Sequence, residues 1–509
     1  MRASDAVEQA DPLAVGVGRF WAIFLVLLVP AGLPVILADV PPLFDYPNHL
    51  ARMYLLGHLA DSQVLQDYYA VDWSLIPNLA MDAVIPLLAR VIPLVWAAKL
   101  FFLATLMLIA AGVAFVHRAA YGRWTLWPLG AFLFLYSRVL LWGFLNYLFG
   151  IGLALVGLAA WIALAERSAW LRLGTGALFA LAAFFAHLMA AIVFAVMVGG
   201  YELGRLLRGG PLRQQPVLPR LGVACLAFVA PAIFFLAGPH YGLDAIRFSP
   251  WVRKLDLPFS VLDDYHRAFD VGCFALLVLG AALLFARRRL AVIASLRLPL
   301  LLLLILYLVA PTQIMTASAV DHRLPLVLAL LLVAATVAPR LPARWARSIA
   351  VLMLALFIVR MGLVAEAWVR ADAVYRRDIS ILNRIPEGAR VALAYPPAAI
   401  SFDAIPKTHL PLLAVIRSNA FVPTLFAYPG QQPVVLTPLG ERLAAEAEPG
   451  MLWRSWMAGG EGAMAAVLKD FDFVLALDRR PFDLPALPGL TPLESEPDFA
   501  LYSVHRSPP

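Results

Sequence analysis

Long apolar runs recur along most of the chain, and most are about as long as a helix that crosses a membrane. They cover residues 20–38, 96–116, 126–142, 145–165, 173–187, 188–204, 221–237, 271–286, 298–311, 324–338 and 348–368. A hydrocarbon core about 30 Å thick requires roughly 20 apolar residues per helix. The runs therefore predict a polytopic α-helical membrane protein with about 11 transmembrane helices, the shorter ones tilted, re-entrant or buried inside the bundle.

Composition excludes a soluble globular protein. Of 509 residues, 62% are hydrophobic and only 14% are charged, whereas an average soluble domain is roughly 25% charged. The two cysteines, Cys225 and Cys273, are too few for a disulfide framework or a thiolate zinc site. The first run lacks a small-residue cleavage pattern, so we predict an uncleaved helix rather than a signal peptide.

The net charge of +7 is distributed unevenly along the chain, and this distribution argues against nucleic acid as a partner. Residues 1–369 carry 27 basic and 18 acidic side chains, and residues 370–509 carry 13 and 15. If the N-terminus lies inside, the inner loops hold 17 basic and five acidic residues, and the outer loops hold eight and twelve. The positive-inside rule predicts this distribution for a protein of the cell inner (plasma) membrane, with membrane lipids as its surroundings.

Three parts follow from this topology. Residues 1–19 form a cytoplasmic N-terminus, and residues 20–369 form the transmembrane domain, with long, aromatic-rich outer loops at 39–80 and 238–270. Such loops are expected to hold short helices on the outer membrane surface. Residues 370–509 have an ordinary globular composition, and their helix and strand patterns alternate. We therefore predict a small C-terminal extracytoplasmic α/β domain.

The predicted elements of this domain can be given by range. They are helices at 372–384 and 461–469 and strands at 390–395, 433–436, 473–477 and 501–504. The domain has no Gly-rich phosphate loop. His409 and the run 419–432, with Phe426 and Tyr428, are candidates for contacting an acceptor, and core packing explains them equally well.

The densest polar cluster runs from Asp39 to Arg52, at the outer end of the first apolar run. Pro47 suits a first helical turn with Asp45 as its cap. Asp45, His49 and Arg52 then share one helix face, where they are able to accept a proton, bind a divalent cation and hold a phosphate. In the competing interpretation Asp45 only caps the helix and Arg52 faces lipid headgroups.

A second cluster, residues 316–325, precedes the tenth run. Arg323 is a candidate clamp for a lipid-linked phosphate, and the alternative is a snorkelling arginine beside Asp321. Polar residues at membrane depth usually face a cavity or a partner, which adds three candidates for substrate binding. These are Asn146, Arg138 and His187, the last of which also suits a hydrogen-bonded turn between two helices.

Familiar hydrolase and ATP-binding motifs do not occur. The sequence has no Ser-His-Asp spacing, no His-Glu-x-x-His and no Walker motif. Hydrolases of those families and direct use of ATP are thereby disfavoured.

The whole arrangement resembles the GT-C glycosyltransferases, which include the protein O-mannosyltransferases and the lipid A aminoarabinose transferases. The shared features are an N-in first helix, a long first outer loop that opens with Asp, about eleven spans, the Arg323-Leu324-Pro325 step and a terminal outer α/β domain. The resemblance implies transfer of a hexosyl or pentosyl group from a polyprenyl-phosphate carrier. The acceptor would be an envelope lipid, glycan or protein.

The resemblance also implies roles for individual residues. Asp45, with Asp39 as a second candidate, matches the acidic position that acts at the acceptor or on a metal, so a divalent cation is the one cofactor left open. Many members carry two adjacent acidic residues here, whereas this chain has Asp45-Tyr46-Pro47, which makes His49 the candidate second polar partner. Arg323 matches the region where relatives contact the carrier phosphate.

Two other functions compete with the enzyme. A transporter or flippase often shows internal repeats and broken helices near the midplane, whereas the polar candidates of this chain collect at the outer surface. A non-catalytic envelope assembly protein would use its outer domain to bind a partner, and it predicts that Asp45 is dispensable.

Overall fold

The computed structural model describes residues 11–209, 217–239, 246–315, 317–396, 405–459, 463–478 and 486–505. Residues 240–245 of the second predicted outer loop, Thr316 of the second polar cluster and the first two residues of the helix predicted at 461–469 lie outside the described residues. The chain forms two compact units. The helical unit comprises Met1–Val35, Leu75–Ala80 and Phe102–Glu366, and the mixed unit comprises Ile36–Ser74, Met81–Phe101 and Ala367–Pro509.

Seven helices in the described part of the chain are long and apolar enough to cross a membrane. They are α1 (Val17–Leu37), α5 (Leu94–Tyr121), α7 (Leu145–Ala163), α8 (Ala169–Ala186), α9 (Leu188–Arg208), α13 (Arg267–Ala286) and α16 (Ala343–Ser380). Helices α10 (Val217–Leu226) and α11 (Val229–Ala237) meet at a bend of 43° and make an eighth span if they cross together. The chain is a multi-pass membrane protein, and the predicted count of about 11 helices is not confirmed.

Three predicted spans differ from long helices. Helices α14 (Arg297–Val309) and α15 (Leu324–Ala335) have only 13 and 12 residues. The run at 126–142 is a 3-10 helix (Trp127–Phe134) followed by the four-residue α6 (Arg138–Leu141). Pro128 and Gly130 explain this last difference, because proline lacks a backbone donor and both residues disfavour a continuous α-helix.

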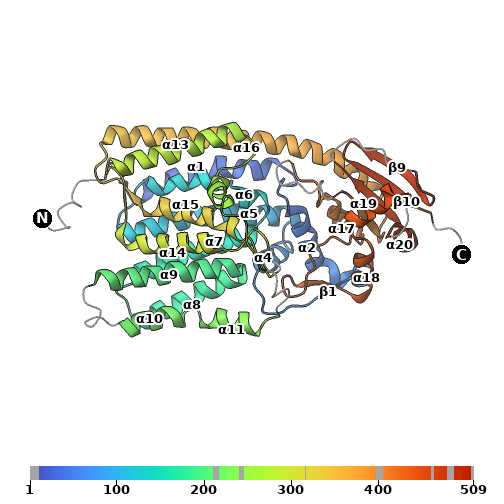
Figure 1. Ribbon diagram of the computed structural model, residues 1–509, viewed down its shortest axis with the longest axis horizontal. Helices are drawn as coiled ribbons and strands as arrows, with labels where there is room; N and C mark the ends of the chain where they lie inside the picture. Colours follow the sequence, from blue (N-terminus) through green and yellow to red (C-terminus); the bar gives the residue numbers. More distant parts are fainter. Residues whose placement is uncertain are drawn as a thin grey trace. The chain divides into compact units, whose positions relative to one another are not determined.

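Small residues let the helices of the helical unit approach closely. Figure 1 shows most of them lying roughly parallel, and α7 packs against both α8 and α9. A Cβ placed on Gly150 of α7 would lie 2.6 Å from the Cβ of Ala190 in α9, and one on Gly176 of α8 would lie 2.5 Å from the Trp161 ring in α7. In lipid no hydrophobic driving force brings helices together, so they associate through close packing at small residues.

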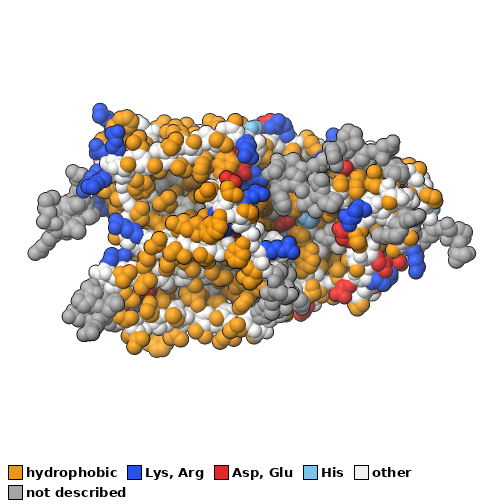
Figure 2. All heavy atoms as spheres, in the orientation of Figure 1, with side chains coloured by type: hydrophobic (Ala, Val, Ile, Leu, Met, Phe, Trp, Pro, Cys, Tyr) orange, Lys and Arg blue, Asp and Glu red, His pale blue; other side chains and the backbone are white. Residues whose placement is uncertain are grey.

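The outer faces of these helices are suited to lipid. Val29 of α1 is 70% exposed, and Leu279 of α13 and Val351 of α16 are exposed to a similar degree. Contiguous apolar surface on this scale is unfavourable in water but matches a hydrocarbon core. Figure 2 shows a broad hydrophobic surface over the helical unit, with Lys and Arg side chains gathered at its left-hand end.

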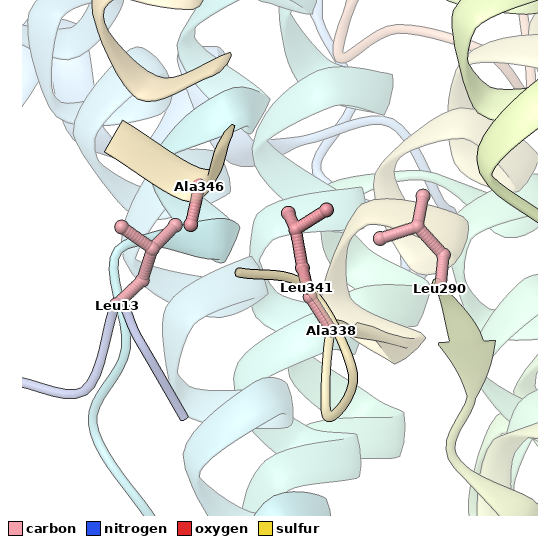
Figure 3. Close-up of a cluster of buried hydrophobic side chains, with 5 residues drawn as sticks. All are labelled: Leu13, Leu290, Ala338, Leu341 and Ala346. Atoms are coloured by element: carbon pink, nitrogen blue, oxygen red, sulfur yellow. The ribbon is translucent and has the colours of Figure 1, made fainter. Parts of the chain in front are cut away.

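A small hydrophobic cluster joins segments of the helical unit that are distant in sequence. Leu13, Leu290, Ala338, Leu341 and Ala346 are buried together (Figure 3). They come from the segment before α1, the segment after α13, the segment between α15 and α16, and the first turn of α16. Their burial anchors the segment that precedes the first predicted span.

The mixed unit contains a four-stranded sheet. Its strand order is β6 (Val391–Ala394), β8 (Phe473–Leu477), β10 (Phe499–Val504) and β9 (Leu490–Glu496). The β6–β8 pair is parallel, and the other two pairs are antiparallel. The helices of this unit are α2 (Tyr46–His58), α3 (Gln63–Gln66), α4 (Ala80–Leu88), α17 (Leu413–Ser418), α18 (Pro438–Glu446), α19 (Pro449–Met457) and α20 (Ala463–Asp470).

Residues 39–74 of the first predicted outer loop belong to the mixed unit together with the C-terminal region. Strand β1 (Tyr69–Val71) pairs antiparallel with β7 (Val434–Leu436), so that Tyr69 faces Leu436. The Tyr69 hydroxyl also donates to the carbonyl of Val422. These contacts hold helix α2 and the segment after His409 in one compact body.

Candidate functional site

Asp45 lies at the N-terminal end of α2, as the sequence predicts. Its backbone occupies the cap position and is followed by Pro47 in the first turn, but its side chain makes no capping hydrogen bond. The predicted helix start is therefore right, and the predicted capping role of the carboxylate is wrong. The carboxylate, 14% exposed, faces the side chain of His409 instead.

His409 is the close neighbour of Asp45 from the C-terminal region. Its Nε2 lies 3.7 Å from Oδ1 of Asp45. The rings of Phe44 and Phe426 each lie with their centroids 5.1 Å from the imidazole, in edge-on arrangements. Burial among these rings lowers the pKa of His409 to about 4, so the imidazole is neutral at pH 7.

Asn48 connects His409 to the backbone of the 419–432 segment. Its amide nitrogen donates to the carbonyl of Thr424 at 3.0 Å and lies 3.3 Å from Nδ1 of His409. Its amide oxygen accepts from the backbone N–H of Phe426 at 2.8 Å. Sequence reasoning missed this role, although Asn48 follows Asp45 by three residues and so lies within one helical turn of it.

The other residues of the predicted helix face have separate environments. His49 is buried, with its ring 5.9 Å from that of Phe426. Arg52 is fully buried and forms a two-point ion pair with Asp82 of α4, at 2.7 and 3.0 Å. This side chain therefore does not face lipid headgroups, and its pairing gives it a structural role in the mixed unit.

Asp39 lies in a more exposed environment than Asp45. Its side chain is 66% exposed and pairs with Arg376 at 3.1 Å. Its backbone N–H donates to the carboxylate of Asp372 at 2.7 Å. These contacts hold the start of the first loop against the end of α16 within the mixed unit.

Arg323 is the centre of the polar cluster in the helical unit. It is 7% exposed, and its guanidinium lies 4.3 Å from the centroid of the Phe144 ring. One terminal nitrogen donates to the carbonyl of Ser318 at 3.1 Å, and the other lies 2.9 Å from Nε2 of His187. The Tyr147 hydroxyl donates to the backbone carbonyl of Arg323. The structure thus brings together two of the predicted substrate-binding residues.

His187 occupies the turn between α8 and α9, as predicted. It caps α9, because its Nδ1 accepts from the backbone N–H of Met189 at 3.1 Å. The other ring nitrogen of His187, Nε2, lies 2.9 Å from a terminal nitrogen of Arg323. A neutral imidazole has one acceptor nitrogen, so the N–H of Met189 and the Arg323 guanidinium compete for it.

The remaining predicted residues of the helical unit have structural partners. Asp321 is fully buried and pairs with Lys254 at 2.9 Å, a partner that the sequence did not indicate, rather than with Arg323. The amide of Asn146 donates to the backbone and side chain of Asn78, which holds a turn in place.

Arg138 and the acidic residues of the second loop also pair with one another. Arg138 is ion-paired with Asp263. Asp264 and Asp270 pair with the buried Arg360 at 3.1 and 2.8 Å. In the described part of the chain, no group of three or more His, Cys, Asp or Glu side chains is arranged to hold a metal ion.

The fold of this chain is shared with a solved structure. The chain matches no protein-family model and no curated protein. Its structure is similar to that of a mycobacterial arabinofuranosyltransferase, AftD, with a TM-score of 0.54 and 15% sequence identity. The similarity covers 98% of this chain, which spans about 40% of the length of AftD. The chain therefore shares the fold of this arabinofuranosyltransferase, and the predicted resemblance is confirmed at the level of fold.

Proposed function

We propose that this protein is a membrane glycosyltransferase that moves a sugar from a polyprenyl-phosphate carrier to an envelope acceptor at the outer face of the membrane. The observation that carries the proposal is the GT-C fold over 98% of the chain, shared with an arabinofuranosyltransferase. Which hexosyl or pentosyl group is moved is left for the experiment below to identify.

Asp45 is the proposed general base. Its carboxylate removes the proton from an acceptor hydroxyl while the hydroxyl oxygen attacks the anomeric carbon of the donor sugar. The bond from that carbon to the phosphate oxygen breaks, and polyprenyl phosphate leaves with the bonding electrons. A positioned base contributes about 100-fold to 10,000-fold to such a reaction. The position of Asp45 at a helix start, with its side chain not used for capping, supports this role.

Arg323 and His187 are the proposed phosphate contacts. A phosphate oxygen accepts hydrogen bonds from the Arg323 guanidinium, which lies 2.9 Å from Nε2 of His187, and an Nε2–H of His187 is able to donate to the same phosphate. Phe144 and the Ser318 carbonyl hold the guanidinium in place. Negative charge grows on the leaving phosphate in the transition state, so a fixed cation at this position accelerates its departure.

The test uses the purified full-length protein in detergent. Farnesylphosphoryl mannose, glucose, galactose and arabinofuranose are supplied one at a time, with a membrane extract of cells lacking the protein as acceptor. Release of farnesyl phosphate and labelling of the extract are measured by mass spectrometry. We expect one donor to be consumed, and we expect Asp45→Asn to reduce the rate by about 100-fold or more.

Asp61→Asn is the matched control, because Asp61 is an exposed aspartate of the same loop. It should react at the wild-type rate. Full activity of the Asp45→Asn protein would contradict the proposed base. Consumption of none of the donors would instead favour a transporter or an assembly protein, and a comparison of envelope glycans between deletion and wild-type cells identifies the acceptor if transfer occurs.

A further inference from the structure

The side chain of Asn48 is hydrogen-bonded to Nδ1 of His409, and the other ring nitrogen of His409 faces Asp45. We infer that His409 is a positioning residue for Asp45. Asn48 orients the imidazole of His409 so that the Nε2–H of this ring is donated to the Asp45 carboxylate. This inference rests on the proposed role of Asp45 as the base. A residue of the C-terminal region would then position the proposed base of the first loop.

The first step is the orientation of the Asn48 amide. One end accepts from the backbone N–H of Phe426 at 2.8 Å, so that end is the oxygen. The other end donates to the carbonyl of Thr424 at 3.0 Å, so that end is the nitrogen. Two backbone groups of opposite character therefore fix which way the amide faces, and Asn48 is fully buried.

The second step is the protonation of His409. Because the Asn48 nitrogen is a donor and lies 3.3 Å from Nδ1 of His409, Nδ1 accepts and carries no proton. The single proton of the neutral ring is then on Nε2. A cationic ring would place a second donor against Asn48, which disfavours the charged form in addition to the burial that lowers the pKa of His409.

The third step is the contact with Asp45. Nε2 lies 3.7 Å from Oδ1 of Asp45, which is slightly longer than a hydrogen bond. Catalytic hydrogen bonds are often long without substrate and tighten when it binds. Donation to one carboxylate oxygen fixes the rotation of the Asp45 carboxylate relative to the acceptor hydroxyl.

The surroundings of His409 support positioning rather than proton transfer by the ring itself. Phe44 and Phe426 enclose the imidazole, and its neighbour Lys407 is occupied by ion pairs with Asp378 and Asp498. The ring is therefore held as a neutral donor of fixed direction.

Two substitutions separate positioning from packing. In His409→Asn the amide oxygen occupies about the place of Nδ1 and keeps the Asn48 contact, but the side chain is too short to donate to Asp45. In His409→Gln the amide nitrogen occupies about the place of Nε2 and keeps that donor. We expect His409→Asn to lower kcat by roughly 10-fold to 100-fold with an unchanged KM for the farnesylphosphoryl sugar. We expect His409→Gln to recover most of the wild-type kcat.

If His409 has a purely structural role, the activities of the variants should instead follow their melting temperatures. Equal activity of His409→Asn and the wild type would overturn the inference, as would lower activity of His409→Gln than of His409→Asn. If Asp45→Asn is inactive while His409→Asn is normal, the positioning role fails and the proposed function stands. If the wild-type protein transfers no sugar, the proposed function fails and takes the positioning role with it.

A measurement on the wild-type chain keeps the inference testable if the variants do not fold. Nitrogen NMR shifts of the full-length protein with labelled histidine distinguish a protonated from an unprotonated Nδ1. We expect His409 to have an unprotonated Nδ1 and a protonated Nε2 at pH 7. The opposite tautomer, or a cationic ring, would overturn the orientation on which the inference depends.

Discussion

The buried ion pair between Arg52 and Asp82 allows a quantitative test of the mixed unit. Both side chains are fully buried, and two hydrogen bonds of 2.7 and 3.0 Å join them. The substitution Asp82→Asn keeps the shape of the side chain and removes its charge. The Arg52 guanidinium is then left buried without a counter-ion.

The expected cost follows from this geometry. Removing one partner of a buried pair typically costs about 3 to 5 kcal/mol, because the remaining charge is uncompensated. For a domain of roughly 150 to 250 residues, each kcal/mol lowers the melting temperature by about 2 to 4 °C. We therefore expect Asp82→Asn to lower the melting temperature on the order of 10 °C. Replacing both residues, as Arg52→Met with Asp82→Leu, should recover most of this loss, because no charge is left buried.

The assay is thermal unfolding of the full-length protein in one detergent, followed by intrinsic fluorescence for the wild type, the Asp82→Asn variant and the double variant. A change of less than about 1 °C in Asp82→Asn, the size expected of an exposed site, would refute the reasoning. Sugar transfer by a stable double variant tests the role of Arg52 separately. Retained transfer means that Arg52 acts only in structure, whereas lost transfer restores it as a substrate-binding residue.

Two further predictions concern pH and topology. The pKa of His409 is about 4 in the folded chain and about 6.5 in the unfolded chain. Because the unfolded chain takes up a proton first, this residue contributes stability above pH 6.5 that is lost as the pH falls towards 4. Relative to His409→Asn, the wild type should lose about 3 kcal/mol of unfolding free energy between pH 7 and pH 4 in denaturant titrations. A cysteine at the exposed Ser495, in a chain whose exposed Cys225 is replaced by serine, should react with an impermeant thiol reagent added to intact cells, and protection would contradict an outer C-terminal region.

Apolar runs were the most reliable predictors of secondary structure. The runs at 20–38 and 145–165 correspond to α1 (Val17–Leu37) and α7 (Leu145–Ala163), because each is long enough to form a helix whatever its neighbours are. The predicted strand at 473–477 has the same bounds as β8. It is a short apolar run buried between two strands, so local pattern and tertiary environment agree.

Other elements could not be predicted because tertiary contacts decide them. Strand β9 (Leu490–Glu496) includes Pro492 and lacks an apolar run, and it forms by pairing at the sheet edge with β10. The run at 126–142 is as apolar as a span, but its proline and glycine are accommodated as a 3-10 helix within the unit. Hydrophobicity alone carries no information about either outcome.

The sequence by itself determined that this chain is a multi-pass membrane protein, and it placed Asp45 at the start of a helix after the first span. These properties depend on composition and on the spacing of neighbouring residues. Only the tertiary structure decided that Arg52 pairs with Asp82, that Asp321 pairs with Lys254 and that His409 lies between Asn48 and Asp45. Such pairs join residues 30 to 364 positions apart, and a buried polar group takes whichever partner the fold brings close to it.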